Sequence, residues 1–202
     1  MRQVISNQLG DFAAIYDEDV EIISVSRPQA NACESLSNRL ISSRQVLQKQ
    51  WVQSADDAQA PANELSAVAD KEMCSLLFDQ ITEASEMLGE LMGCKQVGVR
   101  VVTLKAPMCP RFHVDYVPCR MLITLTGEGT EWIPNSDVDR DKLADRESKY
   151  PPIHAGRQIQ QLATGCWSLL KGGAWNKKFS GVVHRSPHGE SKRLLLSIDP
   201  VF

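Results

Sequence analysis

The sequence lacks a long apolar run, an excess of basic residues and any pair of cysteines at C-x-x-C spacing. A membrane-spanning helix needs roughly 18 consecutive apolar residues, so we expect no transmembrane segment and no membrane partner. Because the formal net charge is −3, the chain also lacks the basic excess of nucleic-acid-binding proteins, and no nucleic-acid partner is expected. Residues 1–11 have no apolar centre like that of a secretory signal, which favours a cytoplasmic location.

The six cysteines are spread along the chain rather than paired at short spacing. A chain of 202 residues is too long to depend on a disulfide framework, and without a secretory signal we expect reduced thiols. The absence of C-x-x-C pairs also disfavours a zinc site made of four cysteines. The cysteines are therefore expected to behave as small buried side chains.

The sequence does contain enough apolar residues for a core. They make up 43% of the chain, and charged residues make up 23%, which is ordinary for a globular protein. The length fits one domain, residues 1–202. The patterns change near residue 97, so we expect an N-terminal part, 1–96, of strand and helices that supports a β-rich core, 97–202.

The N-terminal part contains one strand pattern and two helix patterns. The β-branched run Val20–Ser26 predicts a strand, and a first helix is expected over 32–50. The polar segment 54–64 is expected to be a surface loop. The second helix, over 66–92, carries apolar residues at steps of three and four, which indicates packing on the protein's own sheet, and Gly93 is placed to end it.

The β-rich part shows short strand patterns separated by clusters of glycine, proline and aspartate. Such spacing is typical of an antiparallel sandwich or of a jelly roll, the double-stranded β-helix. We interpret the polar segment 135–157 as a solvated loop or short helix, with a lid over a site as the alternative. Strands are expected at 97–104, 121–126, 165–170, 181–184 and 193–198.

A His-x-Asp pair, His113 and Asp115, lies between two of these predicted strands. Side chains at positions i and i+2 of an extended strand point to the same face, so both could bind one metal ion. Another imidazole, His184, follows a Gly-Gly turn and two valines much later in the chain. Two imidazoles and one carboxylate form the facial triad of non-haem Fe(II) oxygenases, which leaves metal positions open for substrate or oxygen. We therefore predict these three residues as metal ligands.

With its segments in this order, the region 109–199 resembles the double-stranded β-helix of the 2-oxoglutarate-dependent oxygenases. In that superfamily a basic residue shortly after the distal histidine binds a carboxylate of 2-oxoglutarate, and Arg193 is at the matching position. A guanidinium suits this role because its planar fork donates two hydrogen bonds to a carboxylate. The chain departs from the usual pattern in having Leu195, rather than serine or threonine, two residues after Arg193.

The roles of the arginines have alternatives. Arg193 could be only an ion-pair partner of Asp115 or Asp199. Arg120, which lies on a predicted strand, is the other basic residue that could bind the carboxylate of a substrate.

A closer resemblance covers nearly the whole chain. The segments 109–115, 127–134, 184–187 and 193–199 resemble those of a bacterial family called domain of unknown function 1826. That family has no known reaction, but its genes often accompany zinc-responsive ones, which implies a role in zinc limitation or metal handling. The resemblance therefore supplies a second function class, a zinc-binding protein that uses the same ligands without oxygenase activity.

Two cysteines bear on the choice between these metals. Cys109 lies shortly before His113, and Cys119 lies shortly after Asp115. A thiolate from either would make the site softer and favour Zn(II) over Fe(II), whereas the alternative for each is a small buried side chain. The other two histidines, His154 and His188, are expected at the surface.

Taken together, these patterns predict an α+β protein with a jelly-roll core and two N-terminal helices packed on one sheet. The predicted function is a mononuclear Fe(II) and 2-oxoglutarate-dependent dioxygenase that acts on a small molecule or a protein. The alternative is the zinc-binding protein described above. Residue spacing specifies neither the substrate nor the oligomeric state.

Overall fold

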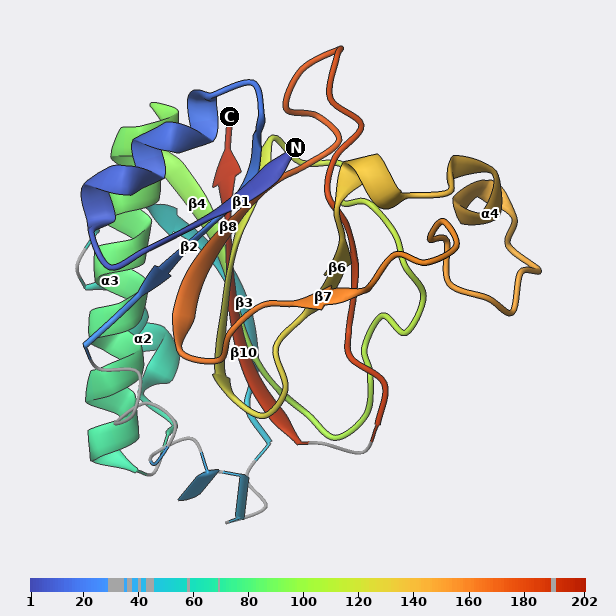
Figure 1. Ribbon diagram of the computed structural model, residues 1–202. Helices are drawn as coiled ribbons and strands as arrows, with labels where there is room; N and C mark the ends of the chain where they lie inside the picture. The colour runs from blue at the N-terminus through green and yellow to red at the C-terminus, as the bar shows by residue number, and fades with distance from the viewer. Residues whose placement is uncertain are drawn as a thin grey trace.

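In a computed structural model, which describes residues 1–28, 35, 38, 39, 41, 42, 46–57, 59–68, 70–189 and 192–202, the chain forms an α+β structure. A seven-stranded sheet lies between a long helix on one side and a three-stranded sheet on the other (Figure 1). Side chains from the two sheets pack together, which gives the double-stranded arrangement that the strand pattern predicts.

The larger sheet takes strands from both ends of the chain. Its order is β1-β2-β8-β5-β10-β4-β3, and its pairs are antiparallel except for β1 with β2. Alternate residues of each strand face the helix or the smaller sheet. The strands are β1 (Arg2–Ser6), β2 (Val20–Ser26), β3 (Gln48–Ser54), β4 (Gln96–Leu104), β5 (Cys119–Thr126), β8 (Cys166–Lys171) and β10 (Arg193–Val201).

The smaller sheet has the order β7-β6-β9. Its strands are short: β6 (Glu131–Ile133), β7 (Gln160–Gln161) and β9 (Val183–Arg185). Trp132 of β6 is buried in one cluster with Leu122 and Leu195 of the larger sheet. This apolar contact holds the two sheets together beside the cavity described below.

The helix α3 (Lys71–Met92) covers the outer face of the larger sheet (Figure 1). It begins later than the predicted 66–92, because the Asp70 side chain accepts hydrogen bonds from the amides of Glu72 and Met73 and so caps the helix. Gly93 ends it as predicted, with a φ of 64° that favours glycine. The apolar stripe is buried except at its end, where Leu91 is partly buried; the fully buried members are Met73, Leu77, Ile81, Ala84 and Leu88.

The segment between β2 and α3 differs from the prediction. Of the helix expected over 32–50, residues 32–34, 36, 37, 40 and 43–45 lie outside the described residues, and residues 35, 38, 39, 41 and 42 are helical. The end of this prediction is wrong, because Gln48–Ser54 is strand β3. This strand pairs with β4 at the edge of the sheet, and a tertiary pairing of this kind overrides local helix preference. The end of the predicted loop 54–64 is also helical, since α2 (Ala60–Leu65) packs on α3.

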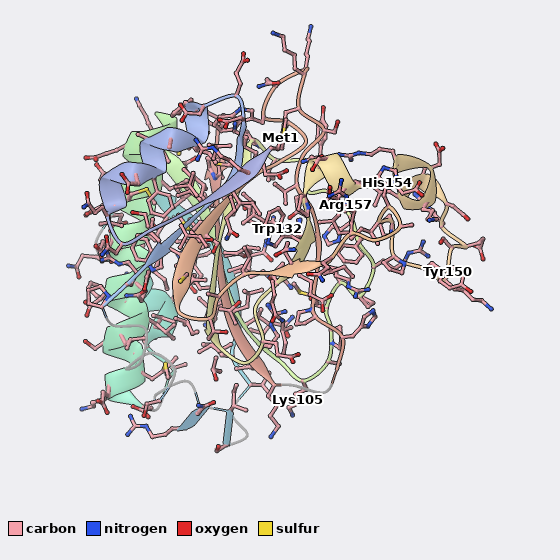
Figure 2. All side chains as sticks on the ribbon, viewed as in Figure 1. Met1, Lys105, Trp132, Tyr150, His154 and Arg157 are labelled. Atoms are coloured by element: carbon pink, nitrogen blue, oxygen red, sulfur yellow. The ribbon has the colours of Figure 1, made fainter. Side chains whose placement is uncertain are left out.

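The polar segment 135–157 forms short elements at the side of the smaller sheet. They are η2 (Asn135–Asp137) and α4 (Arg140–Ala144), and Figure 1 shows α4 projecting from the body of the molecule. Tyr150 and His154, labelled in Figure 2, are exposed. The segment is therefore a solvated loop with short helices. A further 3-10 helix, η1 (Leu9–Tyr16), precedes β2.

Within the described ranges, none of the helices combines the length and the apolarity that crossing a membrane requires.

Candidate metal centre

His113 and His184 come from distant parts of the chain, and their backbones pair directly. The amide of each donates to the carbonyl of the other at 3.0 Å, and the ring centroids lie 4.6 Å apart. His184 belongs to β9, whereas His113 forms only this isolated bridge. The extended strand expected for His113 and Asp115 is therefore absent, and only the single bridge between His113 and His184 remains.

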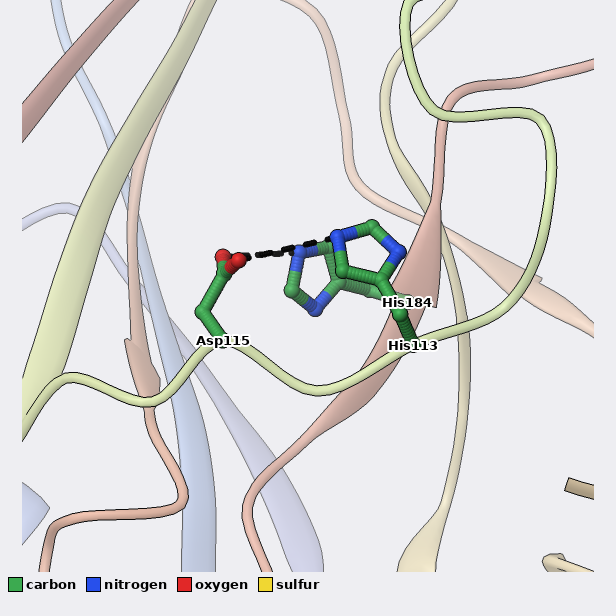
Figure 3. Close-up of side chains that lie close together, drawn as sticks. All are labelled: His113, Asp115 and His184. Carbon is green, nitrogen blue, oxygen red and sulfur yellow. Dashed lines mark ion pairs between the residues drawn. The ribbon is translucent and has the colours of Figure 1, made fainter. Parts of the chain in front are cut away.

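Both imidazoles turn their Nε2 atoms toward one carboxylate (Figure 3). His184 Nε2 lies 3.1 Å from Asp115 Oδ2, and His113 Nε2 lies 3.6 Å from Asp115 Oδ1. One ligand atom from each of the three residues lies within 4.8 Å of the other two. The structure therefore brings together the three side chains that the sequence predicts as ligands.

The other nitrogen of each imidazole faces a backbone carbonyl. His113 Nδ1 lies 3.0 Å from the Arg111 oxygen, and His184 Nδ1 lies 3.1 Å from the Val182 oxygen. A carbonyl only accepts, so in the neutral ring Nδ1 carries the proton and the lone pair of Nε2 is available to a metal. Two imidazole nitrogens and one carboxylate oxygen fit a divalent transition metal.

Arg120 fixes the carboxylate from the side of the larger sheet. Its Nη1 donates to Asp115 Oδ2 at 2.6 Å, while its Nε and Nη2 donate to the two oxygens of Asp199 at 2.7 and 2.6 Å. The Arg120 guanidinium is therefore engaged by two carboxylates. The pairing with Asp115 and Asp199 that the sequence analysis considered for Arg193 is made by Arg120.

The charges of this cluster reinforce one another. The hydrogen bond to Asp115 raises the pKa of His113, although burial opposes it. Burial alone would raise the pKa of Asp115, but the interactions of the carboxylate with the two imidazoles and with Arg120 outweigh burial and hold this pKa far below its usual range. Burial alone would lower the pKa of Arg120, but the hydrogen bonds to Asp199 and Asp115 outweigh burial and raise this pKa above its usual value. Asp115 is therefore an ionised carboxylate at ordinary pH.

Glycines set the path of the loop that carries Asp115. The amide of Gly173 donates to the Asp115 carbonyl at 2.8 Å. Gly181 has a φ of 79°, and a Cβ there would lie 2.2 Å from Val114 Cγ1. A Cβ at Gly172 would lie 1.9 Å from the Val117 oxygen. Only residues without a side chain allow the loop to pack this closely against the segment between β8 and β9.

Arg193 is buried on β10, with its side chain 3% exposed. Its Nη2 lies 3.2 Å from the Thr130 hydroxyl and 3.4 Å from the Thr124 hydroxyl, while Nε and Nη1 are buried without a hydrogen-bond partner among the described residues. Burial lowers its pKa to about 10. Thr124 and Thr130 were not predicted from the sequence. They supply the hydroxyl groups next to the arginine that a serine or threonine at position 195 would supply and that Leu195 cannot.

The triad and Arg193 line the same cavity, which has a volume of about 300 Å³. Arg120 and Thr130 line it as well, but no residue of 135–157 does. The residues that line the cavity therefore do not support the alternative that the segment 135–157 is a lid over the site. The cavity brings a metal-binding group and a buried cation into one space.

Neither of the two cysteines considered as ligands joins the triad. Cys119 is fully buried on the face of the larger sheet that packs on the helices, and burial raises its thiol pKa. Cys109 lines the cavity, but the close group contains only the two imidazoles and the carboxylate. His154 and His188 are exposed, as predicted.

Comparison with solved structures confirms the predicted fold. The chain is similar to the dioxygenase for auxin oxidation in rice, with a TM-score of 0.57 and 12% identity over 100% of this chain and 83% of that one. It is also similar to dioxygenase for auxin oxidation 1 from Arabidopsis thaliana, in a binary complex with 2-oxoglutarate. There the TM-score is 0.52 and the identity 11%, over 100% and 92% of the two chains. No curated protein matches the sequence.

Comparison with family models confirms the closer resemblance. The model described as "Protein of unknown function (DUF1826)" matches residues 6–199, which is nearly the whole length and includes the triad, Arg120 and Arg193. The chain therefore belongs to the DUF1826 family of proteins of unknown function.

Proposed function

We propose that the chain is a mononuclear non-haem oxygenase that depends on Fe(II) and 2-oxoglutarate. The observation that carries this proposal is the convergence of His113, Asp115 and His184 within 4.8 Å, in one cavity with a buried guanidinium. Two nitrogens of that guanidinium have no hydrogen-bond partner in the part of the chain that the structure describes. A fold shared with two dioxygenases supports it.

The three ligands would hold the metal from one side, and the cavity would leave the other positions to co-substrate and oxygen. When bound, Fe(II) and 2-oxoglutarate would supply oxygen activation and the electrons for it. Arg120 keeps Asp115 oriented and ionised, and the carbonyls of Arg111 and Val182 keep the rings turned toward the site.

Arg193 would bind the distal carboxylate of 2-oxoglutarate. Its Nε and Nη1 are buried with no partner among the described residues, which is a costly arrangement unless an anion completes it. The hydroxyl of Thr130, which also lines the cavity, lies next to the guanidinium and can donate to the same anion. Leu195 would contribute apolar contact to the carbon chain of the bound acid.

The proposal is tested by metal analysis and absorption spectroscopy under anaerobic conditions. We expect the wild-type protein to bind about one Fe(II) per chain and to show a new visible absorption when 2-oxoglutarate is added. His184→Ala should lose most of the iron and the absorption. His154→Ala removes an exposed histidine outside the cavity and should retain both. Tight zinc binding with no response to 2-oxoglutarate would refute the oxygenase proposal and leave the zinc-binding protein as the explanation.

A further inference from the structure

The cavity extends from the triad to the edge of the larger sheet formed by β4 and β3. In the strand register, Arg100 of β4 lies opposite Ser197 of β10 on one side and Gln50 of β3 on the other. Paired residues of adjacent strands project to the same face of a sheet. Their side chains therefore form one row, and all three line the cavity.

Arg100 differs from the other arginines that line this cavity. Arg120 and Arg185 are each held by carboxylates, and Arg193 has the proposed role toward 2-oxoglutarate. The Arg100 side chain has no hydrogen bond or ion pair with any residue that the structure describes. A cation at a cavity wall without a protein partner is suited to bind an anion that enters the cavity.

The positions of Arg100 and Arg193 indicate two separate anionic groups. Arg193 pairs with Leu104 and Ser197 pairs with Arg100, so the two arginines are four residues apart along the same strand pair. At the rise of a strand, this places their backbones about 14 Å apart. A single small dicarboxylate bound at Arg193 would therefore leave Arg100 available for a second molecule.

The floor of the cavity is open beside this row. Gly98 lines it two residues before Arg100, and a Cβ at Gly98 would meet only Val201 Cγ2, at 3.8 Å. Because Gly98 pairs with Asp199 in the strand register, the missing side chain leaves space beside Arg100 on the side of Asp199. A small organic molecule could occupy that space with its charged end on Arg100.

We propose that the β3–β4 end of the cavity binds the substrate through a carboxylate, with Arg100 as the anchor and Gln50 and Ser197 as neighbouring hydrogen-bonding groups. A single guanidinium beside the neutral side chains of Gln50 and Ser197 matches the one charge of a carboxylate better than the nearly two charges of a phosphate monoester. The substrate class is then a small organic acid. That this organic acid is a substrate rests on the proposed function, whereas the binding of a carboxylate at Arg100 does not.

The test measures the binding of small carboxylates to the full chain by isothermal titration calorimetry. The probes are benzoate, hexanoate and phenylpropionate, each paired with its primary amide, and the measurements use protein with and without Fe(II) and saturating 2-oxoglutarate under nitrogen. The variants are Arg100→Gln and Gly98→Leu. The matched control is Lys105→Gln, which removes an exposed cation just beyond β4 that does not line the cavity (Figure 2).

We expect at least one carboxylate to bind the wild type about tenfold more tightly than its amide, since hydrogen bonds between charged groups contribute this much. Arg100→Gln should weaken that binding about tenfold or more, Gly98→Leu should block it by filling the cavity floor, and Lys105→Gln should leave it unchanged. Circular dichroism checks that each variant is folded.

Equal binding of acid and amide, equal binding to the wild type and Arg100→Gln, or no binding of any probe would overturn the proposal. Binding that depends on Arg100 in a protein that fails to respond to Fe(II) and 2-oxoglutarate would retain the carboxylate site and reject the oxygenase. A response to Fe(II) and 2-oxoglutarate without Arg100-dependent binding would retain the oxygenase and reject the carboxylate site.

Discussion

At the scale of single residues, the partly buried Arg120 and the buried Arg193 have different chemistry although both contact polar groups in the cavity. Arg120 is satisfied by Asp199 and Asp115, so it acts as a support for a metal ligand. Arg193 hydrogen-bonds only weakly to two hydroxyls, and its Nε and Nη1 have no hydrogen-bond partner among the described residues. The hydrogen-bond partners, rather than the residue type, decide which of the two arginines can accept a new anion.

Replacing Arg193 by glutamine tests this distinction. We expect Arg193→Gln to weaken 2-oxoglutarate binding about 10- to 100-fold, because charged hydrogen bonds are lost, while Fe(II) binding persists. Titration of the Fe(II) protein with 2-oxoglutarate under nitrogen measures the change. Arg157→Gln, at an exposed arginine outside the cavity, is the control. Unchanged affinity in Arg193→Gln would contradict the assigned anchor.

Glu21 is a buried carboxyl group away from the triad. It accepts hydrogen bonds from the backbone and side-chain nitrogens of Asn135. Burial raises its pKa, and the bonds from Asn135 only partly offset that effect. The raised pKa means that Glu21 contributes stability below its unfolded pKa, and that this contribution is lost as pH rises through the folded pKa.

We therefore expect the free energy of unfolding of Glu21→Gln, relative to the wild type, to increase between about pH 4 and pH 7. Urea unfolding of both proteins across that range measures the difference, in which the other titrating groups cancel. A difference that stays constant or decreases with pH would show that Glu21 is not held in an unfavourable charged state.

At the scale of elements, the site depends on how tightly loops approach one another. Gly181→Ala would place a Cβ against Val114 and the Gly173 backbone and displace the loop that carries Asp115. We expect a loss of about 1–3 kcal/mol in stability and weaker Fe(II) binding. Gly156→Ala is a matched control, because Gly156 has the same φ of 79° but nothing within 4 Å of its Cβ.

The comparison separates backbone strain from the close approach of the loop. Both variants place a non-glycine residue in the left-handed region, so both should lose some stability. Only Gly181→Ala should also lose metal affinity, measured as iron retained after dialysis against a weak chelator. Equal iron retention in the two variants would show that the packing of Gly181 does not position the triad.

At the scale of the whole molecule, the helix layer and the cavity lie on opposite faces of one sheet. Leu77 is fully buried where α3 packs on that sheet, in a cluster that contains no triad residue. Leu77→Ala should lower the free energy of unfolding by about 2–5 kcal/mol. Below its unfolding temperature, the variant should still bind iron at the wild-type stoichiometry. Urea unfolding and metal analysis check the two results, and loss of iron by the folded variant would contradict this separation.

The sequence determined the strongly patterned parts of the protein. The stripe of α3 and the apolar strand patterns of β2, β4, β5 and β10 depend on local composition and periodicity, which are readable along the chain. The His-x-Asp pair, the distal histidine and the strand arginine were recognisable because their order matches a known constellation. Strands β1, β3, β6 and β7 were missed, because these short or edge strands owe their structure to pairing rather than to local composition.

Only the tertiary structure decided which charged groups meet. The partners of Arg120, the threonines beside Arg193 and the row that contains Arg100 come from strands that are adjacent in space but distant in sequence. The tertiary structure also turned Cys119 away from the triad, because alternate residues of β5 face opposite sides of the sheet. The sequence determines which side chains are available as metal ligands and anion-binding groups. Strand register and burial determine the distances between these side chains and which of their charges remain unpaired.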